Sequence, residues 1–256
     1  MADTLPIVVH ATTPERQAAA HRLAATLALP VTTASSAPVQ LLVTDQHLAL
    51  CIAGLGSPIA VEFQTGRAGY RRQHGGSELL AKALGLRRRR HPHIIDACAG
   101  LGQDAWVMAG LGCRVDLLER SSLVVAVLCD GLQRAAHTPE AQRMNVHCAD
   151  ARIWLAHLSE AQRPDIVYLD PMYPQRGTRA LAGKAARALR AVVGDDADAD
   201  ELFVVARRCA RYRVVVKRPR QAVYLGGAVP DLQYQGRSTR FDVYLSASAP
   251  PPSLQA

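Results

Sequence analysis

From residue 93 onward, short apolar runs alternate with stretches of helical periodicity, and this alternation constrains the fold more than any other feature. Apolar runs separated by helices are typical of parallel β-strands joined by crossover helices. The expected strands cover residues 93–97, 115–118, 145–148, 165–169 and 213–217. The expected helices cover residues 103–111, 123–136, 151–158, 183–193 and 198–210. The pattern predicts an α/β domain whose mostly parallel sheet carries helices on both faces.

The chain has 256 residues, which is more than one such domain usually needs. Its first part shows a different pattern, and we expect residues 1–64 to form a small N-terminal α+β subdomain. The expected elements of this part are a strand at 7–10, a helix at 14–29, a hairpin of 40–43 with 48–52, and a further strand at 59–63.

The remaining segments follow from turn residues and composition. Residues 65–93 predict a glycine-punctuated basic linker followed by a helix at 77–84. The main α/β domain is expected over 94–248, with an antiparallel pair of strands at 221–225 and 240–245 near its end. The Pro-rich residues 249–256 predict a flexible tail.

Composition excludes several classes of protein. Hydrophobic residues make up 49% of the chain and charged residues 20%, which favours a packed core over disorder. No run of 18 apolar residues predicts a membrane span, and the N-terminal residues lack the features of a secretory signal. The six cysteines are scattered, and the histidines lack ligand spacing with them. We therefore expect reduced thiols, no metal site and a cytoplasmic protein.

A glycine-rich turn joins the first strand of the α/β domain to its first helix. The segment reads Asp96-Ala97-Cys98-Ala99-Gly100-Leu101-Gly102-Gln103-Asp104-Ala105. Glycines suit a sharp turn where a ligand approaches the backbone without meeting a Cβ atom. Glu119 ends the next strand, where a carboxylate can accept hydrogen bonds from the two hydroxyls of a ribose. The segment predicts a cofactor site, and a tight turn without a ligand is the plain alternative.

Two classes of cofactor fit this turn. Residues 100–105 match G-x-G-x-x-A, which permits a nicotinamide or flavin dinucleotide. Asp96 and Asp104, however, place negative charge where a pyrophosphate prefers none. Both carboxylates favour a cationic sulfonium and an amino group, so S-adenosylmethionine is the preferred prediction. Asp150, after the third strand, is placed to cap a helix, to contact an adenine amino group, or both.

The fourth strand ends in a rigid loop, Tyr168-Leu169-Asp170-Pro171-Met172-Tyr173-Pro174. At the carboxyl edge of a parallel sheet such a loop lies beside the cofactor crevice. The Asp170 carboxylate and the Pro171 carbonyl could accept the hydrogen bonds of an exocyclic amine while the Tyr173 ring stacks on the base. A type I turn with a packed tyrosine is the alternative.

These segments together resemble a known family. The motifs are Asp-x-x-Ala-Gly-Leu-Gly-x-Asp at 96–104, Leu118-Glu119-Arg120, the loop at 168–174 and Val214-Val215-Val216-Lys217-Arg218-Pro219. From about residue 63 to residue 245 the chain resembles the bacterial ribosomal small-subunit methyltransferase J family. The resemblance implies a class I, Rossmann-like fold and transfer of a methyl group from S-adenosylmethionine to the N2 amine of a guanine near the 3′ end of 16S ribosomal RNA.

Position by position, the resemblance implies cofactor contacts from Gln103, Asp104, Glu119, Arg120, Asp150, Ala151 and Asp170. With the residues of the glycine-rich turn, the predicted cofactor set also includes Asp96, Gly100 and Gly102. The predicted catalytic residues are Asp170, Pro171 and Tyr173. Gln103 replaces a residue that is often basic in the family, the pair at 150–151 varies within it, and Tyr173 stands where Phe or Tyr serves as the stacking ring.

The net charge of +8 comes from two basic stretches. Residues 63–93 carry eight Lys and Arg against one acid, and residues 202–230 carry seven against none. We expect both stretches to flank the pocket and to bind 16S ribosomal RNA, either free or within the 30S subunit. The predicted RNA contacts are Arg67, Arg71, Arg72, Lys217 and Arg218. The run Arg87–Arg90, taken alone, also fits a solvated connector.

Other functions account for part of this pattern. The same loop could serve to methylate another RNA base or a protein amide. A dinucleotide-dependent oxidoreductase fits the glycine-rich turn but leaves the loop at 170–174 unexplained. A noncatalytic RNA-binding module fits the charge alone.

Overall fold

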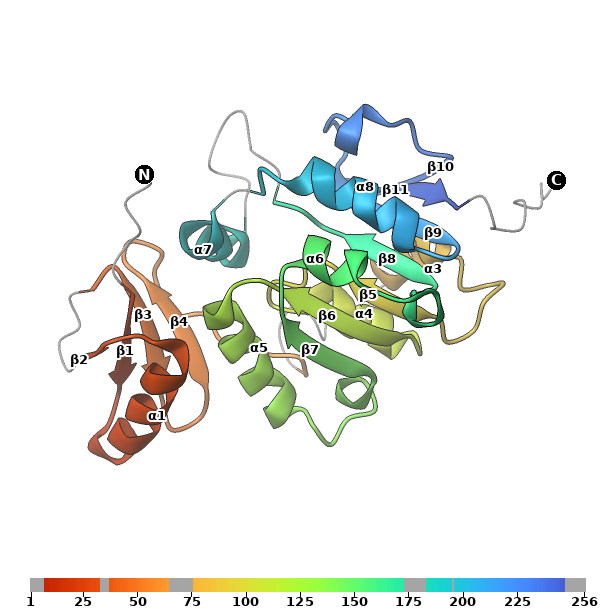
Figure 1. Ribbon diagram of the computed structural model, residues 1–256. Coiled ribbons are helices and arrows are strands. Elements are labelled where there is room, and N and C mark those ends of the chain that lie inside the picture. Colours follow the sequence, from red (N-terminus) through yellow and green to blue (C-terminus); the bar gives the residue numbers. More distant parts are fainter. Residues whose placement is uncertain (1–6, 33–36, 65–75, 173–182, 195, 247–256) are drawn as a thin grey trace.

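The computed structural model describes residues 7–32, 37–64, 76–172, 183–194 and 196–246. Its larger sheet has the strand order β10-β11-β9-β8-β5-β6-β7 (Figure 1). The strands are β5 (His93–Asp96), β6 (Arg114–Glu119), β7 (Met144–Cys148), β8 (Ile166–Leu169), β9 (Arg213–Pro219), β10 (Leu232–Gln235) and β11 (Thr239–Leu245). Strands β5 to β9 are parallel, and β11 is antiparallel to both of its neighbours. The predicted class I, Rossmann-like α/β fold is confirmed.

Helices cover both faces of this sheet (Figure 1). The helices are α3 (Gly76–Leu84), α4 (Gln103–Gly110), α5 (Ser122–Arg134), α6 (Ala151–Ala156), α7 (Lys184–Val193) and α8 (Ala199–Cys209). Residues of α3, α4 and α5 share one apolar cluster with Val115 and Leu117 of β6, whereas residues of α6 and α8 share a second cluster with Leu118. Burial on both faces explains why the central parallel strands β5, β8 and β9 contain continuous apolar runs.

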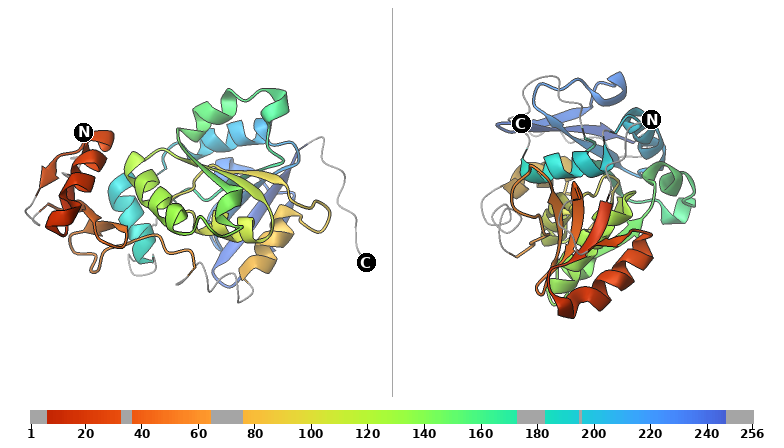
Figure 2. Two further views of the ribbon diagram at one scale, coloured as in Figure 1. Left: turned by 90° about the horizontal axis from the view of Figure 1, so that it is seen from below. Right: turned by 90° about the vertical axis from the view of Figure 1, so that its left-hand side faces the viewer.

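The N-terminal residues form a second sheet with the order β2-β1-β3-β4. Its elements are β1 (Ile7–Ala11), the 3-10 turn η1 (Pro14–Arg16), α1 (Gln17–Leu27), β2 (Val31–Thr32), β3 (Val39–Val43) and β4 (Leu48–Ile52). Strands β3 and β4 form the predicted antiparallel hairpin, while β1 pairs in parallel with β2 and β3. Figure 2 shows this sheet beside α5 and α7.

The segment that follows β4 packs against the large sheet. The rings of Phe63 and Trp106 stack with their centroids 4.5 Å apart. Arg134 of α5 donates hydrogen bonds to the Val61 carbonyl at 2.6 Å and to the Glu62 carboxylate at 2.8 Å. One apolar cluster accordingly contains residues of both sheets. The division of the chain at residue 64 stays a prediction.

Three segments differ from the expected elements. The segment 221–225 forms no strand: Val223 is 67% exposed, and the 3-10 turn η5 (Leu225–Gly227) follows it. The partner of β11 is instead β10, in which Gln233 and Gln235 obscure the apolar pattern of a strand. Of the expected strand at 59–63, only Ile59 pairs, as an isolated bridge with Leu50. The two-residue strand β2 was too short to predict.

Three further features concern the cysteines, possible metal ligands and the length and polarity of the helices. All six cysteines are free thiols. Within the described ranges, no three His, Cys, Asp or Glu side chains are grouped as metal ligands would be. Each helix of the described chain is too short or too polar to cross a lipid bilayer.

Candidate active site

The strand order of the large sheet reverses between β5 and β8, and a pocket of about 410 Å³ lies at the carboxyl ends of these strands. In open α/β sheets, ligands bind at such a switch point. The structure brings most of the predicted site residues to this pocket. Those that line it are Asp96, Gly100, Gln103, Asp104, Glu119, Arg120, Asp150, Ala151, Asp170, Pro171 and Lys217.

The glycine-rich turn needs its glycines for backbone conformation and for packing. The φ angles are +50° at Gly100 and +70° at Gly102, a region that side chains rarely adopt. Gly102 is the N-cap of α4, and a Cβ atom there would lie 2.7 Å from Leu128. The packing of the core behind the turn therefore requires glycine at position 102, whereas Gly100 lines the pocket itself.

Glu119 ends β6 with its carboxylate oriented by the backbone. Its Oε2 accepts a hydrogen bond from the Gly100 N–H at 3.0 Å, and its Oε1 accepts one from the Ser121 N–H at 2.8 Å. Burial raises the pKa of Glu119 above its ordinary value, against the effect of these two bonds. Each carboxylate oxygen can accept a second bond, so the group remains suited to a pair of hydroxyls.

The deepest acid of the pocket is Asp96, which is 2% exposed. Burial and then the negative charge of Asp104 raise the pKa of Asp96 to about 8. The Cys98 N–H donates to Asp96 Oδ1 at 3.2 Å and partly offsets this effect. A positively charged ligand would relieve the repulsion between the two carboxyl groups, whereas an anion would add to it.

Lys217 of β9 lies between two carboxylates of the pocket. Its Nζ donates to Asp104 Oδ2 at 2.5 Å and to Asp170 Oδ2 at 2.7 Å, and the Tyr168 hydroxyl donates to the same Asp104 oxygen at 2.8 Å. Burial alone would lower the pKa of Lys217, but Asp170 and Asp104 raise it above its ordinary value. This placement is at odds with the predicted contact of Lys217 with RNA phosphates, because its charge is engaged inside the pocket.

The remaining predicted RNA contacts are Arg218, which the structure describes, and three arginines that lie outside the described ranges. Arg218 is 4% exposed and donates to the Val223 carbonyl at 3.0 Å, so its burial is likewise at odds with a role on an RNA surface. Four predicted residues lie outside the described ranges, namely Arg67, Arg71, Arg72 and Tyr173. Their roles stay predictions.

Arg120 connects the end of β6 to two aspartates of the segment before α8. Its guanidinium forms ion pairs with Asp196 and, at 3.0 Å, with Asp198. Asp196 Oδ2 also accepts a hydrogen bond from the Met172 N–H at 2.7 Å. Arg120 and Asp196 together tie the cofactor side of the pocket to the loop that follows Asp170-Pro171.

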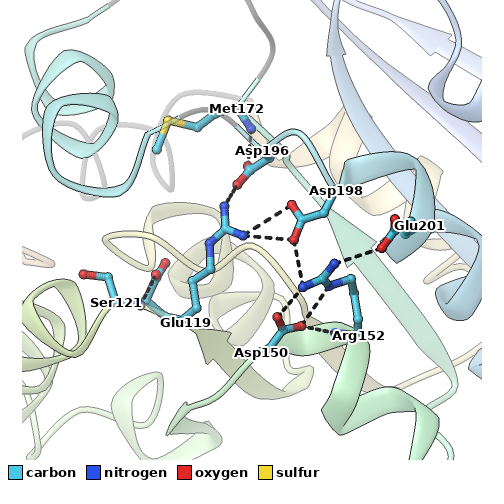
Figure 3. Close-up of polar contacts among 9 residues, drawn as sticks. Glu119, Ser121, Asp150, Arg152, Met172, Asp196, Asp198 and Glu201 are labelled. Atoms are coloured by element: carbon cyan, nitrogen blue, oxygen red, sulfur yellow. Dashed lines mark hydrogen bonds and ion pairs between the residues drawn. The ribbon is translucent and has the colours of Figure 1, made fainter. Parts of the chain in front are cut away.

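A second arginine extends this network toward α6 (Figure 3). Arg152 forms ion pairs with Asp150 at 2.8 Å, with Glu201 at 2.9 Å and with Asp198 at 3.3 Å. Asp150 caps α6 by accepting a hydrogen bond from the Arg152 N–H at 2.9 Å, as predicted for a helix N-cap. The hydrogen bond from the Arg152 side chain, more than any other effect, lowers the pKa of Asp150.

Sequence reasoning missed three of these residues, Arg152, Asp196 and Asp198. Residues 194–200, Gly-Asp-Asp-Ala-Asp-Ala-Asp, hold a run of acids before a helix, and Arg120 follows a strand end. These two local features are the only signals of the network in the sequence. They do not indicate a contact, because Arg120 lies 76 and 78 positions from Asp196 and Asp198 in the chain.

Comparison with known proteins gives the family. A family model described as "Putative SAM-dependent methyltransferase" matches residues 22–246. The chain is 46% identical over 255 residues to a protein of Thioalkalivibrio sulfidiphilus, covering 96% of this chain and 100% of the relative. It is 44% identical over 242 residues to a protein of Nitrosococcus oceani, covering 91% and 95%. Both relatives are named ribosomal RNA small subunit methyltransferase J.

A solved structure agrees with this result. The SAM-dependent methyltransferase NGO1261 from Neisseria gonorrhoeae is 37% identical, with a TM-score of 0.76 over 98% of this chain and 99% of that one. The similarity therefore extends over both sheets and the pocket. This chain belongs to the ribosomal RNA small subunit methyltransferase J family of S-adenosylmethionine-dependent enzymes.

Proposed function

We propose that the chain methylates the exocyclic N2 amine of a guanine in 16S ribosomal RNA. The observation that carries the proposal is the joining of two sites in one pocket: an acidic cleft beside the glycine-rich turn, and Asp170-Pro171 at the end of β8. The names of the relatives support small-subunit ribosomal RNA as the substrate. The resemblance of the loop at 168–174 to the family motif supports a guanine and its N2 amine.

The residues of the pocket fit S-adenosylmethionine. Glu119 would hold the ribose hydroxyls, Asp150 the adenine amino group, and Asp96 with Asp104 the cationic end of the cofactor. When bound, the cofactor supplies a methyl group, whose bond to sulfur breaks as its bond to nitrogen forms. A dinucleotide fits less well, because the same carboxylates would repel its pyrophosphate.

The substrate side of the pocket would be formed by Asp170, Pro171 and Tyr173. The Asp170 carboxylate, oriented by its ion pair with Lys217, accepts a hydrogen bond from the amine, and the Pro171 carbonyl accepts a second. Asp170 also takes the proton that the nitrogen loses after methyl transfer. The ring of Tyr173 is proposed to stack on the guanine. Since such a transfer needs chiefly in-line placement of the amine, no strong base is required.

Asp170→Asn tests the catalytic assignment. We expect the rate of methyl incorporation to fall by about 10²- to 10³-fold, because the acceptor of the amine proton is lost. Calorimetric titration should show whether S-adenosylmethionine still binds. Asp45→Asn, on the N-terminal sheet, serves as the matched control and should keep full activity. A fully active Asp170→Asn enzyme would contradict the assignment.

The form of the RNA substrate is a separate proposal. We propose that the basic residues Arg67, Arg71 and Arg72 bind ribosomal RNA near the pocket, either free or within the 30S subunit. Methyl incorporation into isolated 30S subunits and into naked 16S RNA distinguishes these substrates. Neutralising Arg71 and Arg72 together should weaken RNA binding and reduce its dependence on salt, while cofactor affinity stays unchanged.

A further inference from the structure

The amino ends of four neighbouring strands carry a line of arginines, on the opposite edge of the sheet from the pocket. Strands β9, β8, β5 and β6 lie side by side in this order. The arginines at or just before their first residues are Arg211 before β9, Arg213 at the start of β9, Arg163 before β8, Arg88, Arg89 and Arg90 before β5, and Arg114 at the start of β6. We call these seven residues the arginine row.

The row is contiguous in space as well as in strand order. Arg211 donates through its backbone N–H to the Pro164 carbonyl and through its guanidinium to the Glu160 carbonyl at 2.7 Å, which joins the start of β9 to the segment before β8. The backbone N–H of Asp165 donates to the His93 carbonyl at 3.0 Å, which joins the segment before β8 to β5. The Arg114 N–H donates to the Pro92 carbonyl at 3.1 Å, which joins β5 to β6.

Like charges in the row lie close enough to affect one another. Burial is the main cause that lowers the pKa of Arg213, and the positive charges of Arg89 and Arg88 lower it further. Arg89 is held with its guanidinium 3.3 Å from the centre of the Tyr212 ring. Repulsion of this kind destabilises the isolated protein, and a polyanion that binds the row would remove it.

The acidic residues at this edge are too few to neutralise the positive charge of the arginine row. Among the described residues they include Asp165, Glu160, Asp116 of β6, which pairs with His93 at 2.6 Å, and, two strands beyond β9, Asp231. Asp165 is itself engaged, because it accepts a hydrogen bond from the His93 N–H at 2.9 Å and lies 3.7 Å from Arg89. The side chains of Arg88, Arg90, Arg114, Arg163 and Arg211 are exposed. The edge therefore presents an excess of accessible positive charge.

The spacing of the row suits a phosphate backbone. Neighbouring strands are about 4.8 Å apart, so four strands spread the arginines over about 14 Å. Guanidinium groups bind phosphate oxygens in pairs, and a nucleic acid strand offers one negative charge about every 3.4 Å. A linear polyanion can therefore engage several arginines at once.

We propose that the arginine row is a second RNA-binding surface, which contacts 16S ribosomal RNA away from the target base. This proposal rests on the proposed function for the identity of the RNA. Strand β5 runs from His93 at this edge to Asp96 at the pocket, which is three residue steps of about 3.3 Å each. About 10 Å of strand therefore separates the start of β5 from the pocket, and the row lies at or before the strand starts. Figure 1 shows the loop before β5 and the helix α7 at opposite ends of the sheet. The substrate must then be an RNA large enough to extend along the sheet.

The test is a charge reversal with a matched control. The variant Arg90→Glu with Arg163→Glu changes two exposed arginines of the row. The control, Arg22→Glu with Arg237→Glu, makes the same change of charge on α1 and on the β10–β11 turn, where both arginines are also exposed. Equilibrium binding is measured for naked 16S RNA and for 30S subunits at several salt concentrations, and S-adenosylmethionine binding is measured alongside.

We expect the row variant to bind naked 16S RNA about tenfold or more weakly than the control, at a salt concentration of about 100 mM. The slope of log affinity against log salt should fall by about 1.4 to 1.8, which corresponds to two phosphate contacts. Cofactor binding should be unchanged in both variants.

Two results would overturn the proposal. One is that the row variant binds RNA as tightly as the control variant does. The other is a loss confined to 30S subunits, which would assign the row to a ribosomal protein. Methyl incorporation by the unmodified enzyme is measured in parallel. If that fails, the proposed function is wrong, while the binding data still decide whether the row holds RNA.

Discussion

Asp96 binds a proton more tightly than an ordinary aspartate, since burial and the charge of Asp104 raise its pKa to about 8. A cationic ligand beside it favours the ionised form. Binding of S-adenosylmethionine near neutral pH should therefore release a proton. Because the bound state then holds fewer protons than the free state, cofactor affinity should rise with pH until about pH 8.

The measurement is calorimetry between pH 6 and pH 8 in buffers of different ionisation enthalpy. We expect the affinity of the unmodified enzyme to rise by up to about tenfold per pH unit, which is the limit for release of one proton. In Asp96→Asn the affinity should no longer rise with pH, because the carboxyl group that loses the proton is absent. Equal pH dependence in the two proteins would contradict a role for Asp96 in binding the cationic ligand.

At the scale of elements, the connection between α7 and α8 contacts the start of the loop after β8. The Asp196 carboxylate accepts a hydrogen bond from the Met172 N–H and also pairs with Arg120, whereas the Asp198 carboxylate pairs, among the residues that the structure describes, with Arg120 and Arg152. Substituting each aspartate in turn therefore distinguishes the contact with Met172 from the other ion pairs of the network. We propose that Asp196 is a positioning residue, which acts through Met172 on Asp170 and Pro171, the proposed acceptors of the amine.

Asp196→Ala should lower the rate constant of methyl transfer by about tenfold or more, because small displacements of reacting groups are costly. Asp198→Ala should lower it by less than about threefold. Single-turnover kinetics with saturating cofactor measures both, and cofactor titration serves as the control. Equal losses in the two variants would mean that the network acts as a whole and that the Met172 contact has no special role.

The sequence predicts elements and sites best where the signal is local. The central strands β5, β8 and β9 contain continuous apolar runs because they are buried on both faces, and the Asp96 to Asp104 turn is a contiguous motif. The strand β10 was misplaced, because Gln233 and Gln235 on an edge strand resemble a loop. The bridge from Lys217 to Asp104 and Asp170 joins residues 113 and 47 positions apart, and no local pattern encodes such a contact.

At the scale of the whole molecule, the two sheets share one apolar cluster, with Phe63 stacked on Trp106 at their junction. Phe63→Ala should lower the free energy of unfolding by about 3 to 5 kcal/mol, because it leaves a cavity between the sheets. Urea denaturation followed by circular dichroism and by fluorescence measures the change. Val223→Ala, at a 67% exposed position, is the control and should change little.

Because the two sheets share one core, we expect circular dichroism and fluorescence to report a single unfolding transition in the unmodified protein. Two separate transitions would show that the sheets unfold independently and that the Phe63 contact does not couple them.

The antiparallel strand β11 lies between β9 and β10 and pairs with both. During synthesis, the outer edge of β9 therefore has no partner until residues 239–245 have emerged. An unpaired strand edge is a site of aggregation, and slow pairing of distant strands prolongs its exposure. The time between synthesis of β9 and synthesis of β11 is thus the interval in which the nascent chain depends most on chaperones, and a chain interrupted before residue 239 has no completed sheet.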